Sequence, residues 1–186
     1  MIRYIKKILD VLNVLGKSRV QFIPTIIDDW VEPSTFSIVA DSAWNINGIS
    51  SFPAGAHNNI NVDTSTYGQS YTLNGNIKTI SFDSGECDTV NIGNTIETLI
   101  FDMGFIVPKI DLRNANNLHS MVNYPSVYDI HILHVNAGDN PDVRDAAVTL
   151  MSVAAFPGIV HIPTDAYYYS ELTTQATNYG WTISNY

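Results

Sequence analysis

Short apolar–polar–apolar triplets recur at a fixed interval in the middle of the chain. They are Val90-Asn91-Ile92, Ile110-Asp111-Leu112 and Ile130-His131-Ile132, spaced by 20 and 20 residues. Alternate residues of a strand point to opposite faces, so the apolar members can all point inward while Asn91, Asp111 and His131 line up outside. A single unit of this length cannot bury its own apolar face, so the pattern predicts strands that stack on one another.

A second apolar series lies between the triplets. It comprises Ile77, Ile80 and Phe82, then Ile96, Leu99 and Phe101, then Leu118 and Met121, spaced by 19 and 22 residues. Asn and Gly residues stand between these clusters, where turns favour them. Weaker copies extend the pattern back to about Phe36. The sequence therefore predicts a mainly β protein with some α, whose residues 36–135 form a solenoid-like or leucine-rich-repeat-like stack of strand repeats about 20 residues long.

The first 17 residues predict an amphipathic helix. Its apolar stripe comprises Ile2, Ile5, Leu9 and Leu12, and Gly16 can end it. Asp10 and Asn13 interrupt the apolar stretch and no small-residue cleavage site follows, so we do not expect a secretion signal. The stripe can pack on the chain's own core, on another protein or on a membrane surface. Of these, protein docking is the functional hypothesis.

Two further segments flank the predicted β-body. Residues 18–35 contain Pro24 and Pro33 among many apolar residues, which indicates an extended arm with Trp30 as a second docking candidate. Residues 136–186 predict a helix–strand–helix–strand cap. Asn140-Pro141 suits the start of the first helix, Thr164 or Asp165 the start of the second, and Gly180 its end. Such a cap would cover the open end of the stack.

Composition limits the partners. The formal net charge is −9, and five of the nine basic residues fall within the first nineteen, namely Arg3, Lys6, Lys7, Lys17 and Arg19. Because phosphate binding depends on Lys and Arg, we do not expect a nucleic-acid partner. No segment has the roughly 20 apolar residues that would span a bilayer. Only 15% of residues are charged, a composition commoner in extracellular proteins, adhesins and virion parts than in cytosolic enzymes.

Few residues suggest catalysis, a metal or a cofactor. His131 and His134 are an odd number apart on a presumed strand and would face opposite ways, so we expect no zinc site. The acidic turn from Asp83 to Asp88 could hold Ca²⁺, although a solvated turn is the commoner outcome. Asp83 and Asp102 could stand side by side, as a hydrolase would require. Cys87 and Ser120 lack a recognisable nucleophile loop, so we expect no catalytic residue and no cofactor.

The repeated Ile-x-x-Ile-x-Phe and Val-x-Ile elements with intervening Asn resemble the irregular leucine-rich repeats of the BspA type, known from bacterial surface proteins and phage appendages. The resemblance covers roughly residues 76–186 and includes three tail motifs, Asp139-Asn140-Pro141, Val160-His161-Ile162 and Tyr179-Gly180-Trp181-Thr182-Ile183. The chain departs from the ordinary pattern in having no regular Leu-x-x-Leu-x-Leu run. The resemblance implies binding or architecture and brings no catalytic residues.

These observations lead to one preferred function and one alternative. The preferred function is a non-enzymatic structural or accessory protein of a phage virion, in its head or tail. Its N-terminus would dock on other virion proteins within a large or homo-oligomeric assembly, and its body would be exposed. The alternative is a bacterial cell-surface adhesin or carbohydrate-binding module that uses the aromatic tail. The aromatic candidates are Tyr167, Tyr168, Tyr169 and Trp181, and at least one tyrosine should be exposed.

Overall fold

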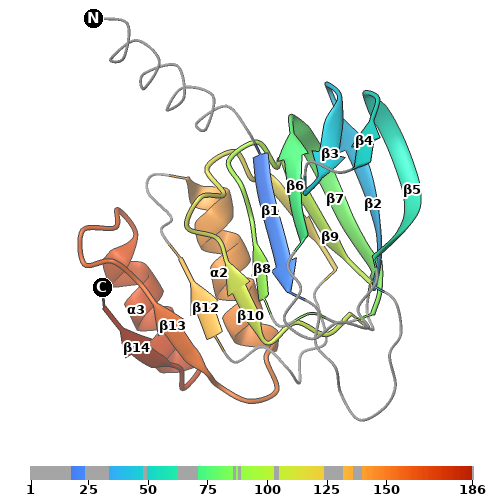
Figure 1. The fold of residues 1–186 in the computed structure, drawn as a ribbon. Helices are drawn as coiled ribbons and strands as arrows, with labels where there is room; N and C mark the ends of the chain where they lie inside the picture. Colours follow the sequence, from blue (N-terminus) through green and yellow to red (C-terminus); the bar gives the residue numbers. More distant parts are fainter. Residues whose placement is uncertain are drawn as a thin grey trace, which may run out of the picture.

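The computed structural model describes residues 18–23, 34–47, 50–62, 71–85, 87, 89–102, 105–123, 132–135 and 140–185. The expected N-terminal helix with Ile2, Ile5, Leu9 and Leu12 lies outside these residues, and so does Trp30. The described residues form a nine-stranded sheet, a five-stranded sheet and the helices α2 (Pro141–Val153) and α3 (Tyr169–Asn178) (Figure 1).

The nine-stranded sheet changes from parallel to antiparallel at its middle. Its order is β14 (Thr182–Ser184), β13 (Ile159–His161), β12 (Ile132–His134), β10 (Lys109–Asp111), β8 (Thr89–Asn91), β1 (Ser18–Ile23), β6 (Tyr71–Gly75), β3 (Trp44–Ile46) and β4 (Ser50–Phe52). The strands from β14 to β8 are parallel neighbours. Strand β1 is antiparallel to both β8 and β6, and β3 is antiparallel to β6 and β4. The first strand of the described chain is therefore central in this sheet.

The five-stranded sheet has the same change of direction. Its order is β11 (Ser120–Val122), β9 (Thr98–Phe101), β7 (Ile77–Ser84), β2 (Ser34–Ala40) and β5 (Gly55–Val62). Strands β11, β9 and β7 are parallel, whereas β2 is antiparallel to β7 on one side and to β5 on the other. In both sheets, therefore, the antiparallel strands come from the first half of the described chain.

The fold-class prediction is wrong in its central feature, because the described body is not a solenoid of repeats. In a solenoid each repeat contacts chiefly the repeats beside it in sequence. Here β1 lies between β6 and β8, and β2 lies between β5 and β7, so early strands pair with strands far along the chain. The segment assigned to an extended arm supplies β1. Among the described residues upstream of about residue 77, these long-range antiparallel pairs leave no regular repeat.

The third triplet is also misplaced by three residues. Val90 pairs in register with Ile110, and Ile110 pairs with Leu133 rather than with Ile130. Leu133 and Val135 are buried, and His134 takes the position expected for His131, which lies outside the described residues. The interval between the second and third strands is thus longer than between the first and second. The third strand is therefore Ile132–His134, and not the Ile130-His131-Ile132 triplet that resembled the other two.

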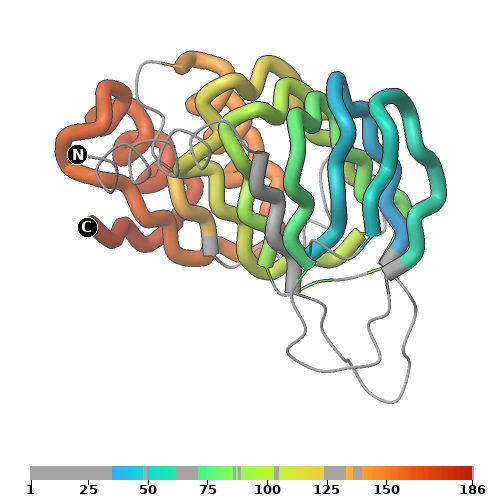
Figure 2. Tube along the Cα trace, turned by 45° about the horizontal axis from the view of Figure 1, so that its top comes forward, coloured from blue at the N-terminus to red at the C-terminus, as the bar shows by residue number. Residues whose placement is uncertain are grey.

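The inward faces of both sheets share one apolar core. On the five-stranded sheet Ile80 pairs with Leu99, and Phe82 pairs with Phe101, with stacked rings 5.3 Å between centroids. Figure 2 shows the strands arranged along the length of the molecule, from the blue and green strands at one end to the red helix–strand tail at the other. Helices α2 and α3 lie behind the parallel strands in Figure 1, on the same side as β9. The buried residues of α2 are Val143, Ala146, Ala147, Leu150 and Met151.

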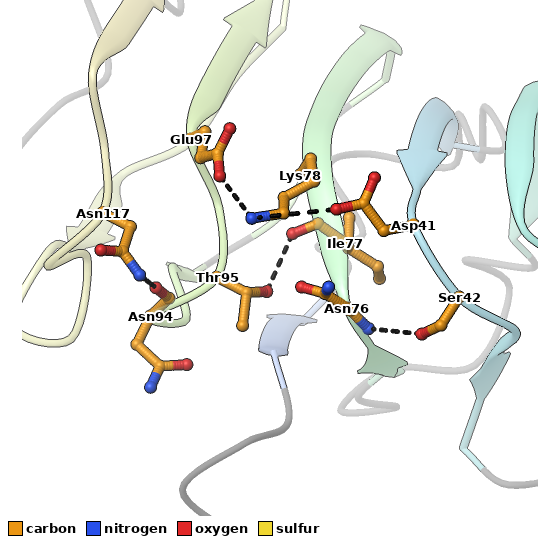
Figure 3. Close-up of polar contacts among 9 residues, drawn as sticks. All are labelled: Asp41, Ser42, Asn76, Ile77, Lys78, Asn94, Thr95, Glu97 and Asn117. Atoms are coloured by element: carbon orange, nitrogen blue, oxygen red, sulfur yellow. Dashed lines mark hydrogen bonds and ion pairs between the residues drawn. The ribbon is translucent and has the colours of Figure 1, made fainter.

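Neutral side chains tie successive turns to one another along one rim. The Thr95 hydroxyl donates to the Ile77 carbonyl at 2.8 Å, and the Asn117 amide donates to the Asn94 carbonyl at 2.6 Å (Figure 3). Two ion pairs join this row, because the Lys78 ammonium pairs with Glu97 and also with Asp41, at 4.0 Å. Asn94 and Asn117, which were predicted as turn residues, therefore also take part in a bond between neighbouring turns.

The row of turn contacts continues into α2. The Asn140 amide donates to the Asn116 and Leu118 carbonyls at 2.8 and 3.2 Å, while its oxygen accepts from the Asp142 backbone N–H at 2.9 Å. Asn140 is the N-cap residue and Pro141 opens the helix, as the sequence predicts. From here the order is α2, β13, α3 and β14, so the tail has the expected helix–strand–helix–strand order.

Candidate binding surface at the C-terminal helices

The four candidate aromatics occupy different environments. Tyr167 is 74% exposed, whereas Trp181 is only 4% exposed and donates from its indole Nε1 to the Met151 carbonyl at 3.1 Å. Tyr168 and Tyr169 are half-buried and pack against the core, and the Tyr169 hydroxyl donates to the Asn185 side chain at 3.1 Å. Trp181 is therefore part of the core, and Tyr167 is the ring that meets solvent.

A turn ahead of α3 positions Tyr167. The Ala166 N–H donates to the Pro163 carbonyl, and the Tyr169 N–H donates to the Ala166 carbonyl. Ala166 is buried, so its neighbour Tyr167 points outward. The helix begins at Tyr169, later than the start expected at Thr164 or Asp165, and Tyr168 at its N-cap makes no side-chain capping bond. Two consecutive turns thus occupy the residues that were expected to form the first helical turn.

Arg144 of α2 holds the half-buried Tyr168 ring in place. Its guanidinium lies 4.8 Å from the Tyr168 ring centroid, a cation–π contact. The same guanidinium pairs with Asp145 at 2.7 Å and with Glu171 of α3 at 3.4 Å. The hydrogen bond to Asp145 is the main reason that the pKa of Arg144 is raised, although burial opposes it. Tyr167 packs edge-on against Tyr168, with 4.8 Å between centroids.

A shallow polar pocket lies on the other flank of α2. It has a volume of about 220 Å³ and is lined by His119, Ser120, Met121, Asp142, Asp145, Ala146 and Thr149. Residues three and four apart on a helix share one face, which explains why Asp142, Asp145 and Thr149 line it together. The His119 Nδ1 lies 3.3 Å from the Asp142 carboxylate. Asp145 lines the pocket and also pairs with Arg144, so this one carboxylate connects the pocket with the Arg144–Tyr168 contact on the opposite flank.

The outer face of the nine-stranded sheet carries a separate polar row. Asn91, Asp111, His134, His161 and Ser184 are register neighbours on consecutive parallel strands. The His134 and His161 rings stack with 4.3 Å between centroids. Burial, followed by the positive charges of His161 and Lys109, lowers the pKa of His134 to about 4. Asp111 was expected to lie outside, but it is only 6% exposed, so the row is partly covered.

Asp83 and Asp102 follow Phe82 and Phe101, which are register neighbours on β7 and β9. The Asp83 carboxylate accepts hydrogen bonds from the Ser37 and Ser81 hydroxyls at 2.5 and 2.6 Å. Asp102 is exposed at the end of β9. Glu86 and Asp88 of the proposed Ca²⁺ turn lie outside the described residues. Within the part of the chain that the structure describes, no three His, Cys, Asp or Glu side chains are grouped as metal ligands would be.

Sequence reasoning identified Tyr167 and Tyr168 but missed the charged residues that are linked to Tyr168. Arg144, Asp145 and Glu171 appear in the sequence only as ordinary charged helix positions. The spacing of Asp142, Asp145 and Thr149 was a usable signal for a shared helix face, but nothing local to it indicates that His119 packs beside that face. These contacts depend on how α2, α3 and β11 pack together.

Comparison of the chain with protein-family models, with curated proteins and with solved structures gave no match. Among the residues that the structure describes, neither α2 nor α3 has the length and apolar character needed to cross a membrane.

Proposed function

We propose that the chain is a non-enzymatic structural or accessory protein of a phage particle. Its N-terminal residues dock on other virion proteins, and its two-sheet body faces outward. The observation that best supports this proposal is the row of turn contacts from Ile77 to Asn140, which is made chiefly by neutral amide and hydroxyl side chains. Such bonds are less sensitive to salt than surface ion pairs, which suits a protein exposed to varied media.

The distribution of charge supports separate roles for the N-terminus and the body. Four of the nine basic residues follow residue 19, and three of these pair with the body's own carboxylates: Lys78 with Glu97, Arg113 with Asp111 and Arg144 with Asp145. The body is therefore acidic on balance, and most of the chain's positive charge is in the N-terminal segment. We propose that this segment, with its apolar stripe, meets the particle.

The docking role is tested by two changes in the stripe. The double variant Ile5→Asp and Leu9→Asp places two carboxylates on the apolar face, whereas Lys6→Ala with Lys7→Ala leaves that face intact. Full burial of each apolar side chain against a partner contributes about 1.5–3 kcal/mol. The first variant should be lost from purified particles and the second retained, as measured by mass spectrometry of particles assembled with each variant.

Deleting residues 1–16 should have the same effect as the double variant, since an isolated helix of about sixteen residues depends on what it packs against. If the stripe instead packs on the chain's own core, the truncated protein should melt several degrees lower. A truncated protein that is both fully stable and still incorporated would contradict both roles. Particles shown by mass spectrometry to lack the wild-type chain would refute the proposed function itself.

The alternative, a bacterial cell-surface adhesin, is favoured by one specific observation, the exposure of Tyr167. Aromatic side chains with one exposed face are enriched at binding sites. Detection of the chain on the outside of a bacterial cell, and not in particles, would decide for this alternative.

A further inference from the structure

We propose that Tyr167 and the charged residues linked to it through Tyr168 form a binding site for a neutral saccharide. The site comprises the Tyr167 ring, the carboxylates of Asp145 and Glu171, and the polar pocket on the far flank of α2. The inference rests on the proposed function only in placing this surface on the outside of the particle. The binding chemistry itself follows from the described contacts.

The exposed ring is held by a chain of ordered contacts. Tyr167 packs edge-on against Tyr168, and Tyr168 lies beneath the Arg144 guanidinium, which two carboxylates fix in turn. The buried Ala166 anchors the backbone next to Tyr167. A ring that is already fixed loses little conformational freedom when a ligand packs against it. Tyr167 is therefore prepared to stack against the C–H face of a sugar ring.

The exposed charged groups that are linked to Tyr168 through Arg144 accept hydrogen bonds rather than donate them. The side chains of Asp145 and Glu171 are 64% and 48% exposed, whereas Arg144, the donor between them, is only 22% exposed. An ionised carboxylate offers about four acceptor positions, and Arg144 uses only part of that capacity. Sugar hydroxyls are donors that suit these oxygens. The same carboxylates would repel uronic or sialic acids, so the site should select neutral sugars.

The pocket beside β11 offers a second set of hydroxyl partners. It adds the His119 imidazole, the Ser120 and Thr149 hydroxyls and the Asp142 carboxylate, and Met121 also lines it. The Thr149 hydroxyl already donates to the Asp145 carbonyl at 2.8 Å, so its oxygen is left as an acceptor. The pocket and Tyr168 lie on opposite flanks of α2, a helix about 10 Å across. A ligand that reaches both is an oligosaccharide.

A saccharide fits this surface better than a protein partner does. The core of a protein–protein interface is depleted in charged residues and rich in contiguous apolar area. Here the exposed Tyr167 ring packs on Tyr168, and Tyr168 in turn contacts Arg144, which pairs with Asp145 and Glu171. One aromatic face with several polar side chains around it is suited to a ligand that is itself hydroxylated around an apolar face.

The test is an isothermal titration of the purified full-length chain with oligosaccharides. The neutral probes are maltoheptaose, cellohexaose, chitotetraose and mannotetraose, and the acidic probes are trigalacturonate and 3′-sialyllactose. At least one neutral probe should bind, and Tyr167→Ala should weaken it by about tenfold or more. The matched control is Tyr179→Ala, which removes an exposed tyrosine at the other end of α3. Its affinity should equal that of the wild type.

Three results would overturn the proposal: no neutral probe binds, Tyr167→Ala binds as well as the wild type, or the acidic probes bind as tightly as the neutral ones. Asp145→Asn provides a second check, because losing a charged acceptor should weaken neutral sugars without unfolding an exposed position. The readout uses the isolated chain. If the chain binds sugar but is missing from particles, the phage assignment is refuted. The proposed saccharide site is still supported in that case.

Discussion

Arg113 donates hydrogen bonds to the carboxylate of Asp111 from both its side chain and its backbone. Its Nε donates to Oδ1 and Oδ2 at 2.9 and 3.0 Å, a terminal nitrogen donates to Oδ2 at 2.5 Å, and its backbone N–H donates to Oδ1 at 3.0 Å. Burial alone would raise the pKa of Asp111, but the hydrogen bonds and positive charge of Arg113 outweigh it and lower that pKa. Asp111 is therefore a buried anion with its charge and its hydrogen bonds satisfied.

Replacing Asp111 by Ala should lower the free energy of unfolding by about 1–3 kcal/mol. The variant loses the bidentate pair and the backbone bond, and the freed Arg113 side chain can reach water. Urea melts monitored by circular dichroism measure the change. Asp165→Ala, at an exposed turn position, is the control and should change stability by less than about 0.5 kcal/mol. Equal effects at the two positions would contradict the buried role of Asp111.

Replacing Ile110 by Asp should unfold the body. Ile110 is fully buried between Val90 and Leu133 in the parallel sheet. An unpaired buried carboxylate costs several kcal/mol, a large part of a typical total of about 5–15 kcal/mol. Ile100→Asp, on the half-exposed outer face of β9, should cost less than about 1 kcal/mol. Heteronuclear NMR spectra that stay dispersed for Ile110→Asp would refute the register.

Lowering the pH should destabilise the protein through His134. The pKa of His134 is about 4 in the folded chain, below the value of about 6.5 in an unfolded one. The unfolded state therefore binds more protons between these values, so the stability present above about pH 6.5 is lost as the pH falls towards 4. Because the ring is partly exposed, the loss should be about 1 kcal/mol. Thermal melts from pH 7 to 4 should show a smaller decline for His134→Gln than for the wild type.

Substitutions of Trp181 should lower stability, whereas substitution of Tyr167 should weaken binding and leave stability unchanged. Trp181→Ala removes a buried ring and should cost about 3–5 kcal/mol, while Trp181→Phe loses chiefly the bond to the Met151 carbonyl and should cost about 1 kcal/mol. Tyr167→Ala should leave the melting temperature unchanged. Differential scanning calorimetry of the three variants provides the comparison. A large destabilisation by Tyr167→Ala would show that its ring is part of the core.

Asn140→Ala should lower the free energy of unfolding by about 1–2 kcal/mol. The variant loses the N-cap bond to Asp142 and both bonds to the preceding turn. Asn140→Asp keeps the capping oxygen and loses only the amide donor, so it should fall between the wild type and Asn140→Ala. If Asn140→Asp and Asn140→Ala melt at the same urea concentration, the cap contributes nothing measurable.

The spacing of apolar residues predicted the parallel strands, but it did not predict which strands β1 and β2 pair with. Ile80 with Leu99 and Val90 with Ile110 were found because each strand carries its own apolar alternation. The positions of β1 and β2 in the sheets were not predicted. Tertiary packing decides which strands pair, and the residues of a single strand do not indicate its partners. Leu133 was missed for a related reason, since Ile130-His131-Ile132 has the same local pattern as the true strand nearby.

The candidate surface was predictable only in part. Three consecutive tyrosines cannot all face the core of a helix, so at least one exposed ring was expected, and Tyr167 is exposed. The roles of Tyr168 and Arg144 depend on the approach of α3 to α2, which the sequence does not encode locally. Trp181 was indistinguishable from a surface aromatic until its neighbours were known.

The central place of β1 has a consequence for biosynthesis. Ribosomes release the N-terminus first, so Ser18–Ile23 emerges long before its partners on β6 and β8. Pairing between distant segments is slow, because a long loop must close before any contact rewards it. Until synthesis passes Gly75, the growing chain carries β1 with both edges unpaired, and one edge stays unpaired until Asn91 has been made. A chaperone that binds unpaired strand edges would therefore have the longest time to bind β1.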